Sequence, residues 1–363
     1  MLDVLKKVGI YLFGFLFIFG LVGSTVLFVW HGRNKTPPRP DLELNAWIAS
    51  RGIDSGLAVS IARFPSNRVA KQIFFKHWPP LPGQETGVEA LADELGEAQR
   101  EPLFALGTLG DQFVNQAVLL LHDRGAVDLD KPIGAFLEDL PTHYQDILVY
   151  QLLSHSSGID PSWTDTTAEW PPLATPPGER SVYAVGNLLL ANKLLEKASG
   201  QSAPRFIVEN ILEPLEMKRT VFRSESEVEA GQPEGWYSCL TDVSNWELAF
   251  YRRNLIRLKT YLRAFRPALG IGEKRLDYGL GWELKEYGGL RMEQAPGDGA
   301  LGPTNHCILR FSERAFSIVV LSDKPVSEQD SARLAREIAQ IYLAREMPFA
   351  ERIAHERPIL DGI

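Results

Sequence analysis

The chain has 363 residues, of which 45% are hydrophobic and 23% charged, enough for one large domain or two ordinary domains with a substantial core. Its formal net charge is −8 at pH 7, and no basic patch stands out against that background, which argues against nucleic-acid binding. Two cysteines, Cys239 and Cys307, are too few for a disulfide framework, and both a single bond and two buried thiols stay open. No His-x-x-x-His or paired Cys-x-x-Cys spacing occurs, so we expect no metal site and no cofactor.

The N-terminal part of the chain contains an uncharged apolar run at 8–30, long enough to cross about 30 Å of hydrocarbon as a helix. The run continues past the small residues where a signal peptide would be cleaved, so it predicts an uncleaved anchor. We therefore expect a short tail and one transmembrane segment within 1–35, followed by a proline-rich linker at 36–44. Lysine and arginine flank both sides of the run, so the positive-inside rule does not decide its orientation.

The pattern after the linker predicts an α+β domain at 45–346, with a helical subdomain at about 104–255 inserted between sheet segments and a C-terminal tail at 347–363. Apolar periodicity and glycine or proline breaks predict the individual elements. Strands are expected at 56–63, 68–78, 278–282, 306–311 and 315–321, and helices at 108–124, 148–155, 186–198, within 203–222, at 238–253 and at 331–343.

Four sequence blocks carry a resemblance to a known superfamily. They are LLHDRGAVDLDKP at 120–132, QLLSHSSGI at 151–159, LLEKASGQS at 194–202 and EPLEMKRT at 213–220. Together they resemble serine β-lactamases and penicillin-binding proteins, in the branch of class C β-lactamases, DD-peptidases and related esterases. The resemblance covers about 45–343. It implies an antiparallel sheet flanked by terminal helices and a mostly helical subdomain, which the transmembrane helix expected from the apolar run at 8–30 precedes.

The resemblance implies a first catalytic motif, Ser-x-x-Lys, at the start of a buried helix. Counting back from Gly125 places the serine position at Thr108 and the lysine position at Asp111. The β-methyl group crowds a threonine nucleophile, and an ionised aspartate does not supply the electrostatics of a lysine cation. Helix capping explains the pair better, with Thr108 as N-cap and Asp111 complementing the helix dipole.

The second motif of the superfamily, Tyr-x-Asn, corresponds to Tyr183 and Val185, so the tyrosine is present and the asparagine is absent. Asn187, two residues later, does not obviously replace it. Tyr183 is interpreted either as a buried tyrosine with one hydrogen bond or as a remnant of a catalytic base. Ser156 and Ser157 are discounted as nucleophiles, because the superfamily has small hydroxyl residues there that end a helix and serve as buried hydrogen-bonding groups.

The third motif, a strand with Lys-Thr-Gly or His-x-Gly, corresponds best to Gly297, Asp298 and Gly299, or starts at Pro296 if the loop is one residue longer, and lacks its basic residue either way. His306, the nearest imidazole, is expected to be packed or hydrogen-bonded within the next strand. With all three motifs changed, we expect little acyl transfer by the superfamily mechanism.

These observations favour a membrane-anchored, catalytically degenerate protein that binds, scaffolds or regulates in a cell-envelope complex. We expect a single-pass location in a bacterial inner membrane, with the domain in the periplasm and with a membrane or periplasmic protein as partner. Asp111 and Asp298 would make the cleft acidic, which disfavours carboxylate substrates and suits a basic segment or a neutral ligand. The alternatives are a divergent hydrolase, such as an esterase or peptidase, that uses Thr108 or an unidentified serine with Tyr183 as base, and a sensor that binds cell-wall fragments.

Overall fold

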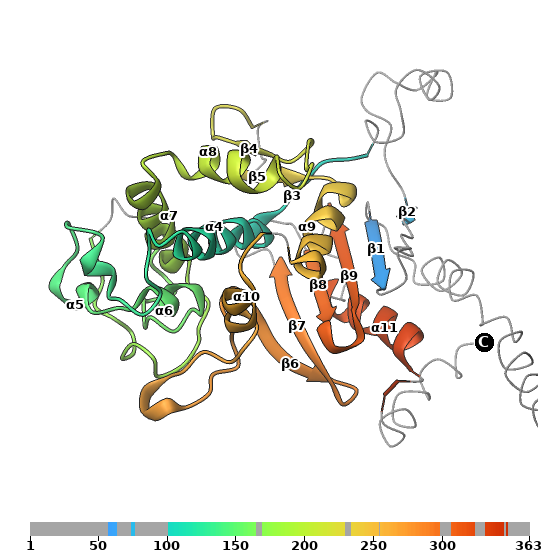
Figure 1. The fold of residues 1–363 in the computed structure, drawn as a ribbon. Helices are drawn as coiled ribbons and strands as arrows, with labels where there is room; N and C mark the ends of the chain where they lie inside the picture. The colour runs from blue at the N-terminus through green and yellow to red at the C-terminus, as the bar shows by residue number, and fades with distance from the viewer. Residues whose placement is uncertain are drawn as a thin grey trace, which may run out of the picture. The chain divides into compact units, whose positions relative to one another are not determined.

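The computed structural model describes residues 57–63, 74–76, 101–164, 169–228, 234–253, 255–297, 306–323, 331–344 and 346–347 (Figure 1). All of them fall within the unit Arg51–Ile363. The predicted anchor at 8–30 and linker at 36–44 lie outside the described residues, as does nearly all of the predicted tail. Among the residues that are described, no helix combines the length and apolar character needed to cross a membrane.

An antiparallel sheet of six strands forms one part of the fold, in the order β2-β1-β9-β8-β7-β6 (Figure 1). Its strands are β1 Leu57–Arg63, β2 Phe74–Lys76, β6 Glu283–Tyr287, β7 Leu290–Gly297, β8 His306–Phe311 and β9 Phe316–Ser322. Every residue of β8 and β9 is buried, which explains their nearly continuous apolar runs. Helix α11 (Ser331–Leu343) contacts β8 and β9, and helix α9 (Leu240–Arg252) contacts β9 and β1.

The hairpin of β6 and β7 replaces the strand that we predicted at 278–282. That segment is wrongly predicted, since it meets β6 only through a bridge between Tyr278 and Glu283. Gly288 and Gly289 connect β6 to β7 with φ values of 58° and 69°, the positive angles that a tight two-residue hairpin turn requires. Because β6 is an edge strand of charged residues, its apolar alternation is too weak to identify it from sequence.

A buried helix, α4 (Asp111–Asp123), organises the helical part of the molecule. It contacts α7 (Val185–Ser199) and α8 (Ala203–Ile207), and even its polar residues Gln112, Asn115 and Gln116 are buried. Shorter helices are α5 Thr142–Gln145, α6 Val149–Leu153 and α10 Leu258–Ala264, with a π-helical turn at Val208–Leu212 and 3₁₀ turns at Gly107–Gly110, Ile133–Ala135, Ile271–Glu273 and Ser312–Arg314. A small sheet has the order β3-β5-β4, from Phe104–Ala105, Gly235–Ser238 and Val221–Arg223.

The mixture of an antiparallel sheet and a helical subdomain confirms the predicted α+β class. The helices predicted at 186–198, 238–253 and 331–343 are confirmed to within two residues at each end. The pairing predicted between the first two strands is confirmed over Phe74–Lys76. The helix predicted at 148–155 is shorter, since α6 ends at Leu153 and His155 takes a positive φ of 50°.

Candidate functional site

The chain enters α4 through a 3₁₀ turn, and this geometry decides the role of Thr108. The turn Gly107–Gly110 has Leu106 as its N-cap, and α4 follows with Gly110 as N-cap, so Thr108 lies inside the turn. The prediction that Thr108 caps the helix is therefore wrong. Gly107, at a φ of 52°, lets the backbone begin the turn earlier than the side-chain pattern indicates. Thr108 is 3% exposed. Asp111 lies in the first turn of α4, as expected, where a negative charge complements the helix dipole.

Tyr183 and Asp111 meet although they are far apart in the sequence. The Tyr183 hydroxyl donates a hydrogen bond to Asp111 Oδ2 at 2.8 Å. Tyr183 stands just before α7, whose first residue is Val185. The positions that correspond to the superfamily's lysine and tyrosine are thus adjacent, and a carboxylate occupies the place where the resemblance implies an amine.

The ring of His155 packs against Tyr183, a contact that was not predicted from the sequence. The two rings have centroids 4.7 Å apart and planes tilted by 37°, and the His155 ring meets Tyr278 edge-on at 5.4 Å. Burial lowers the pKa of His155 to about 4, so the imidazole is neutral near pH 7. His155 belongs to the QLLSHSSGI block. Helix α6 ends at Leu153, and His155 has a left-handed backbone conformation, so its side chain is not placed as it would be within a helix.

The polar residues around His155 belong to the scaffold. Ser157 Oγ donates to Asn187 Oδ1 at 2.6 Å, and Asn187 Nδ2 lies 3.2 Å from His155 Nδ1. Ser154 and Ser156 are bonded to each other through their hydroxyls at 2.8 Å, and all of these side chains are buried. The expectations that Asn187 does not replace the missing asparagine, and that Ser156 and Ser157 serve as buried hydrogen-bonding groups, agree with these contacts.

The third motif segment reaches the same region through β7. This strand contacts the turn that holds Thr108, and its last residue, Gly297, pairs with His306 of β8. His306 Nε2 lies 2.6 Å from the carbonyl oxygen of Ala105, and the N–H of Ser322 donates to His306 Nδ1 at 3.1 Å. The prediction that His306 is hydrogen-bonded within its strand is confirmed, and burial lowers its pKa to about 4. Asp298 and Gly299 lie outside the described residues.

A hollow of about 310 Å³ borders Asp111 and the start of α4. Its charged lining consists of three carboxylates, Asp111, Glu196 and Glu234, and the residues described around it include no lysine or arginine. Trp236, Phe222 and Val114 supply an apolar wall. The hollow thus offers hydrogen-bond acceptors and negative charge beside an apolar wall. This combination favours the binding of a cationic or neutral ligand group over an anionic one.

An antiparallel sheet beside a helical subdomain, with the three motif segments converging at the start of a buried helix, defines the class of serine β-lactamases and penicillin-binding proteins. The Beta-lactamase family model matches residues 112–343, more than half of the chain, and the chain belongs to this family. The assignment places the chain in a hydrolase-like family.

Known proteins agree with this assignment. Penicillin-binding protein 4* of Bacillus subtilis (strain 168) is 21% identical over 315 residues, which cover 70% of this chain and 68% of that protein. The octameric penicillin-binding protein homologue from Pyrococcus abyssi superposes with a TM-score of 0.62 at 20% identity, covering 86% of this chain and 79% of its own. The D-amino acid amidase from Ochrobactrum anthropi SV3, complexed with L-phenylalanine amide, gives 0.62 at 18% identity over 88% and 98% of the two chains. At these identities, the solved structures establish the shared fold.

Proposed function

We propose that this protein is a non-catalytic member of the β-lactamase family that works by binding, as a scaffold or regulator in a cell-envelope complex. The observation that carries the proposal is the hydrogen bond from Tyr183 to Asp111. In the superfamily mechanism that the resemblance implies, this pair of positions would take a proton from a serine. Here the phenol O–H donates a hydrogen bond to a carboxylate, so the pair is arranged as a static hydrogen bond.

The electrostatics of the site also argues against catalysis of acyl transfer. Acyl transfer develops negative charge on a nucleophile oxygen and on the carbonyl oxygen of the substrate. A carboxylate at Asp111 repels both, where a lysine cation would stabilise them. Thr108 adds a methyl group beside the oxygen that would attack and is almost wholly buried. Mutating one such electrostatic contact typically lowers a rate by about 10²- to 10³-fold, and here several are altered together.

The ligand class follows from the hollow beside Asp111. Three carboxylates and no described basic residue around it suit a lysine- or arginine-bearing segment of a partner protein, or a neutral ligand. We propose that the apolar run at 8–30 anchors the chain in a bacterial inner membrane, that the linker at 36–44 separates it from the domain, and that the domain at 45–346 faces the periplasm. A membrane or periplasmic protein is the proposed partner.

Covalent labelling tests the absence of catalysis. A fluorescent penicillin and a fluorophosphonate are each incubated with the full chain in detergent, beside an active penicillin-binding protein as positive control. We expect no labelling of the wild-type protein, and Thr108→Ser should not create it because Asp111 still opposes the alkoxide. Labelling of the wild-type chain that disappears in Thr108→Ala, with thermal unfolding unchanged, would establish a divergent hydrolase instead.

Binding is tested separately through the charge of the cleft. Cross-linking followed by purification from detergent should recover a membrane or periplasmic protein in a stoichiometric ratio. Asp111→Lys should reduce this recovery at least tenfold, because it places a cation where we propose that a cation binds. Glu286→Lys makes the same change of charge at an exposed site on β6 and should leave recovery unchanged. Equal recovery with both variants would refute the proposal that the partner binds at the hollow beside Asp111.

A further inference from the structure

A strongly basic segment runs from Arg252 to Arg275. It contains eight lysines and arginines and one acidic residue, Glu273, within a chain whose net charge is −8. The expectation that no basic patch stands out is therefore wrong at this segment, because the overall charge conceals it. Seven of the eight basic side chains are exposed, and Arg263 is half-buried.

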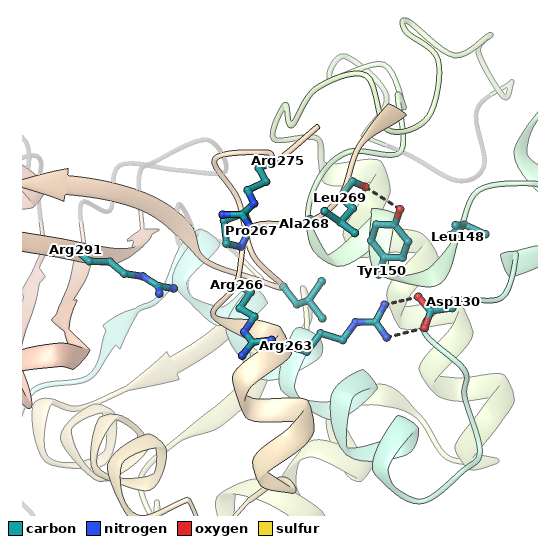
Figure 2. Close-up of a pocket in the computed structure, with 11 residues that line it drawn as sticks. Asp130, Leu148, Tyr150, Arg263, Arg266, Pro267, Ala268, Leu269, Arg275 and Arg291 are labelled. Carbon is teal, nitrogen blue, oxygen red and sulfur yellow. Dashed lines mark hydrogen bonds and ion pairs between the residues drawn. The ribbon is translucent and has the colours of Figure 1, made fainter. Parts of the chain in front are cut away.

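Arginines from this segment and from β7 surround a hollow of about 750 Å³ (Figure 2). Arg263 forms an ion pair with Asp130, which lowers the pKa of that carboxyl through its hydrogen bonds. Arg291 donates to the carbonyl oxygen of Phe265. Arg266 and Arg275 are exposed, and neither forms a salt bridge with another described residue. Two guanidinium groups are therefore available to an anion at the rim of this hollow.

Exposed apolar side chains accompany these arginines. Leu258 and Leu262 of α10 are 49% and 42% exposed, and Leu269 and Ile271 of the following loop are 51% and 58% exposed. The other exposed large hydrophobic residues among those described, Val182 and Val221, are 37% and 38% exposed. The loop is held in place, because Tyr150 Oη donates to the carbonyl oxygen of Leu269 at 2.9 Å and the N–H of Ile271 donates to the carbonyl oxygen of Gly178 at 2.9 Å. The exposure is thus a fixed property of a structured surface.

We propose that α10 and the loop to Arg275 form a surface that docks on a lipid bilayer containing anionic phospholipids. In this arrangement the leucine and isoleucine side chains enter the boundary between headgroups and acyl chains, while the arginines bind headgroup phosphates. Exposed aliphatic residues interspersed with basic ones favour a bilayer as the partner, because it supplies both anionic headgroups and acyl chains. A soluble acidic protein would supply charge but would leave the aliphatic side chains in contact with water. The docking surface follows from described residues alone and does not depend on the anchor proposed at 8–30.

The docking surface is distinct from the site around Asp111. Arg291 stands near the start of β7, and Gly297, beside the turn that holds Thr108, is its last residue. Six residues of strand separate the two by roughly 20 Å. The hollow surrounded by arginines and the turn that holds Thr108 therefore lie at different ends of β7.

The test uses the full chain in nanodiscs of phosphatidylcholine, with or without phosphatidylglycerol. An environment-sensitive fluorophore is attached to Leu262→Cys, and the two native cysteines are buried and do not compete. Val221→Cys, where Val221 is 38% exposed on β4, carries the matched control label. We expect a blue shift for the Leu262→Cys label in anionic nanodiscs, reversed by high salt, and none for the Val221→Cys label. No shift, or equal shifts in neutral and anionic discs, would overturn the proposal.

Charge variants identify the occupant. Arg266→Glu with Arg275→Glu should abolish the shift, and Arg266→Lys with Arg275→Lys should retain at least half of it, because docking on phosphates requires charge more than guanidinium geometry. Loss of the shift in the lysine variant would indicate a pocket for a specific small anion. A shift produced in neutral nanodiscs by inorganic phosphate or by polyglutamate, and not by anionic lipid, would assign the surface to a soluble partner. Either result contradicts lipid docking.

Discussion

Two buried histidines stabilise the region of the three motifs while carrying no charge. His155 packs against the ring of Tyr183, and His306 joins β8 to the segment that precedes Thr108 through its bond to Ala105. In each case burial is the main cause of the lowered pKa. For His306, a proton on Nε2 and a lone pair on Nδ1 satisfy both of its partners, so the neutral ring is the form that fits. At this scale the two histidines contribute through neutral hydrogen bonds and ring contacts, beside the bond from Tyr183 to the Asp111 carboxylate.

The lowered pKa of His306 predicts a loss of stability in acid. The folded state disfavours the proton, so stability is complete above the ordinary pKa of 6.5 and falls as the pH drops towards about 4. Urea unfolding of the wild-type chain should show this decrease, to which His306 contributes up to about 3 kcal/mol. His306→Asn should be less stable at pH 7 and have a shallower pH dependence, with His155 supplying the remainder. Parallel pH profiles for the two proteins would show that His306 does not contribute to the loss of stability in acid.

At the scale of elements, a glycine fixes how α6 is joined to the loop that leads to Tyr183. Gly158 has a φ of 79°, and a Cβ built on it would lie 2.0 Å from the carbonyl oxygen of Thr175. The N–H of Ala174 also donates to the carbonyl oxygen of Gly158 at 2.8 Å, so the two backbones are in direct contact. The close approach holds the QLLSHSSGI block against the segment before α7.

Gly158→Ala should therefore destabilise the protein by about 2 to 4 kcal/mol, through both the unfavourable φ and the backbone clash. Gly125→Ala is the matched control, because Gly125 has nearly the same φ of 77° and an alanine Cβ there would meet no atom within 4 Å. It should lose only about 1 kcal/mol. Midpoints of urea unfolding measure both losses. Equal losses would show that the contact with Thr175 contributes nothing.

The elements that could be predicted from sequence are those whose signal is local and apolar. Strands β8 and β9 and helix α11 have unbroken or periodic apolar patterns, and glycines mark several ends. The hairpin of β6 and β7 was missed because its edge strand is charged, although Gly288 and Gly289 indicate the turn. The role of Thr108 was misjudged because a backbone turn at Gly107 precedes the helix. The resemblance assigns Tyr183 and Asp111 to their motif positions, whereas their contact and the support from His155 come from the three-dimensional structure.

At the scale of the whole described unit, charge is distributed unevenly along β7. Carboxylates line the hollow by Asp111, near the Gly297 end, and arginines surround the hollow by Arg291, near the start of the strand. Such a separation orients a molecule in an electric field and at an anionic surface. A domain docked through its basic surface would present its acidic hollow away from the lipid, so the two proposed binding roles are compatible.

A buried ion pair lies in the core between the strands and α9. Arg310 Nε is 2.8 Å from Glu247 Oε1, and both side chains are almost fully buried. The rings of Phe250, Phe265 and Trp282 lie 4.6 to 5.3 Å from the guanidinium carbon. Burial raises the pKa of Glu247 to about 7, and Arg310 opposes that rise. The pair therefore joins the sheet to the helices through charges that have no access to water.

Replacing one member of this pair should lower the free energy of unfolding far more than expected from replacing both. Arg310→Met leaves Glu247 buried without its counter-charge and should lower the free energy of unfolding by about 3 to 5 kcal/mol. Glu247→Met should also destabilise, because it removes the carboxylate that lies 2.8 Å from Arg310 Nε. The double variant buries no unpaired charge from this pair, so its loss should be smaller than the sum of the two single losses by at least about 2 kcal/mol. A double-mutant cycle from urea unfolding measures this difference, and additive losses would show that the two charges do not stabilise each other.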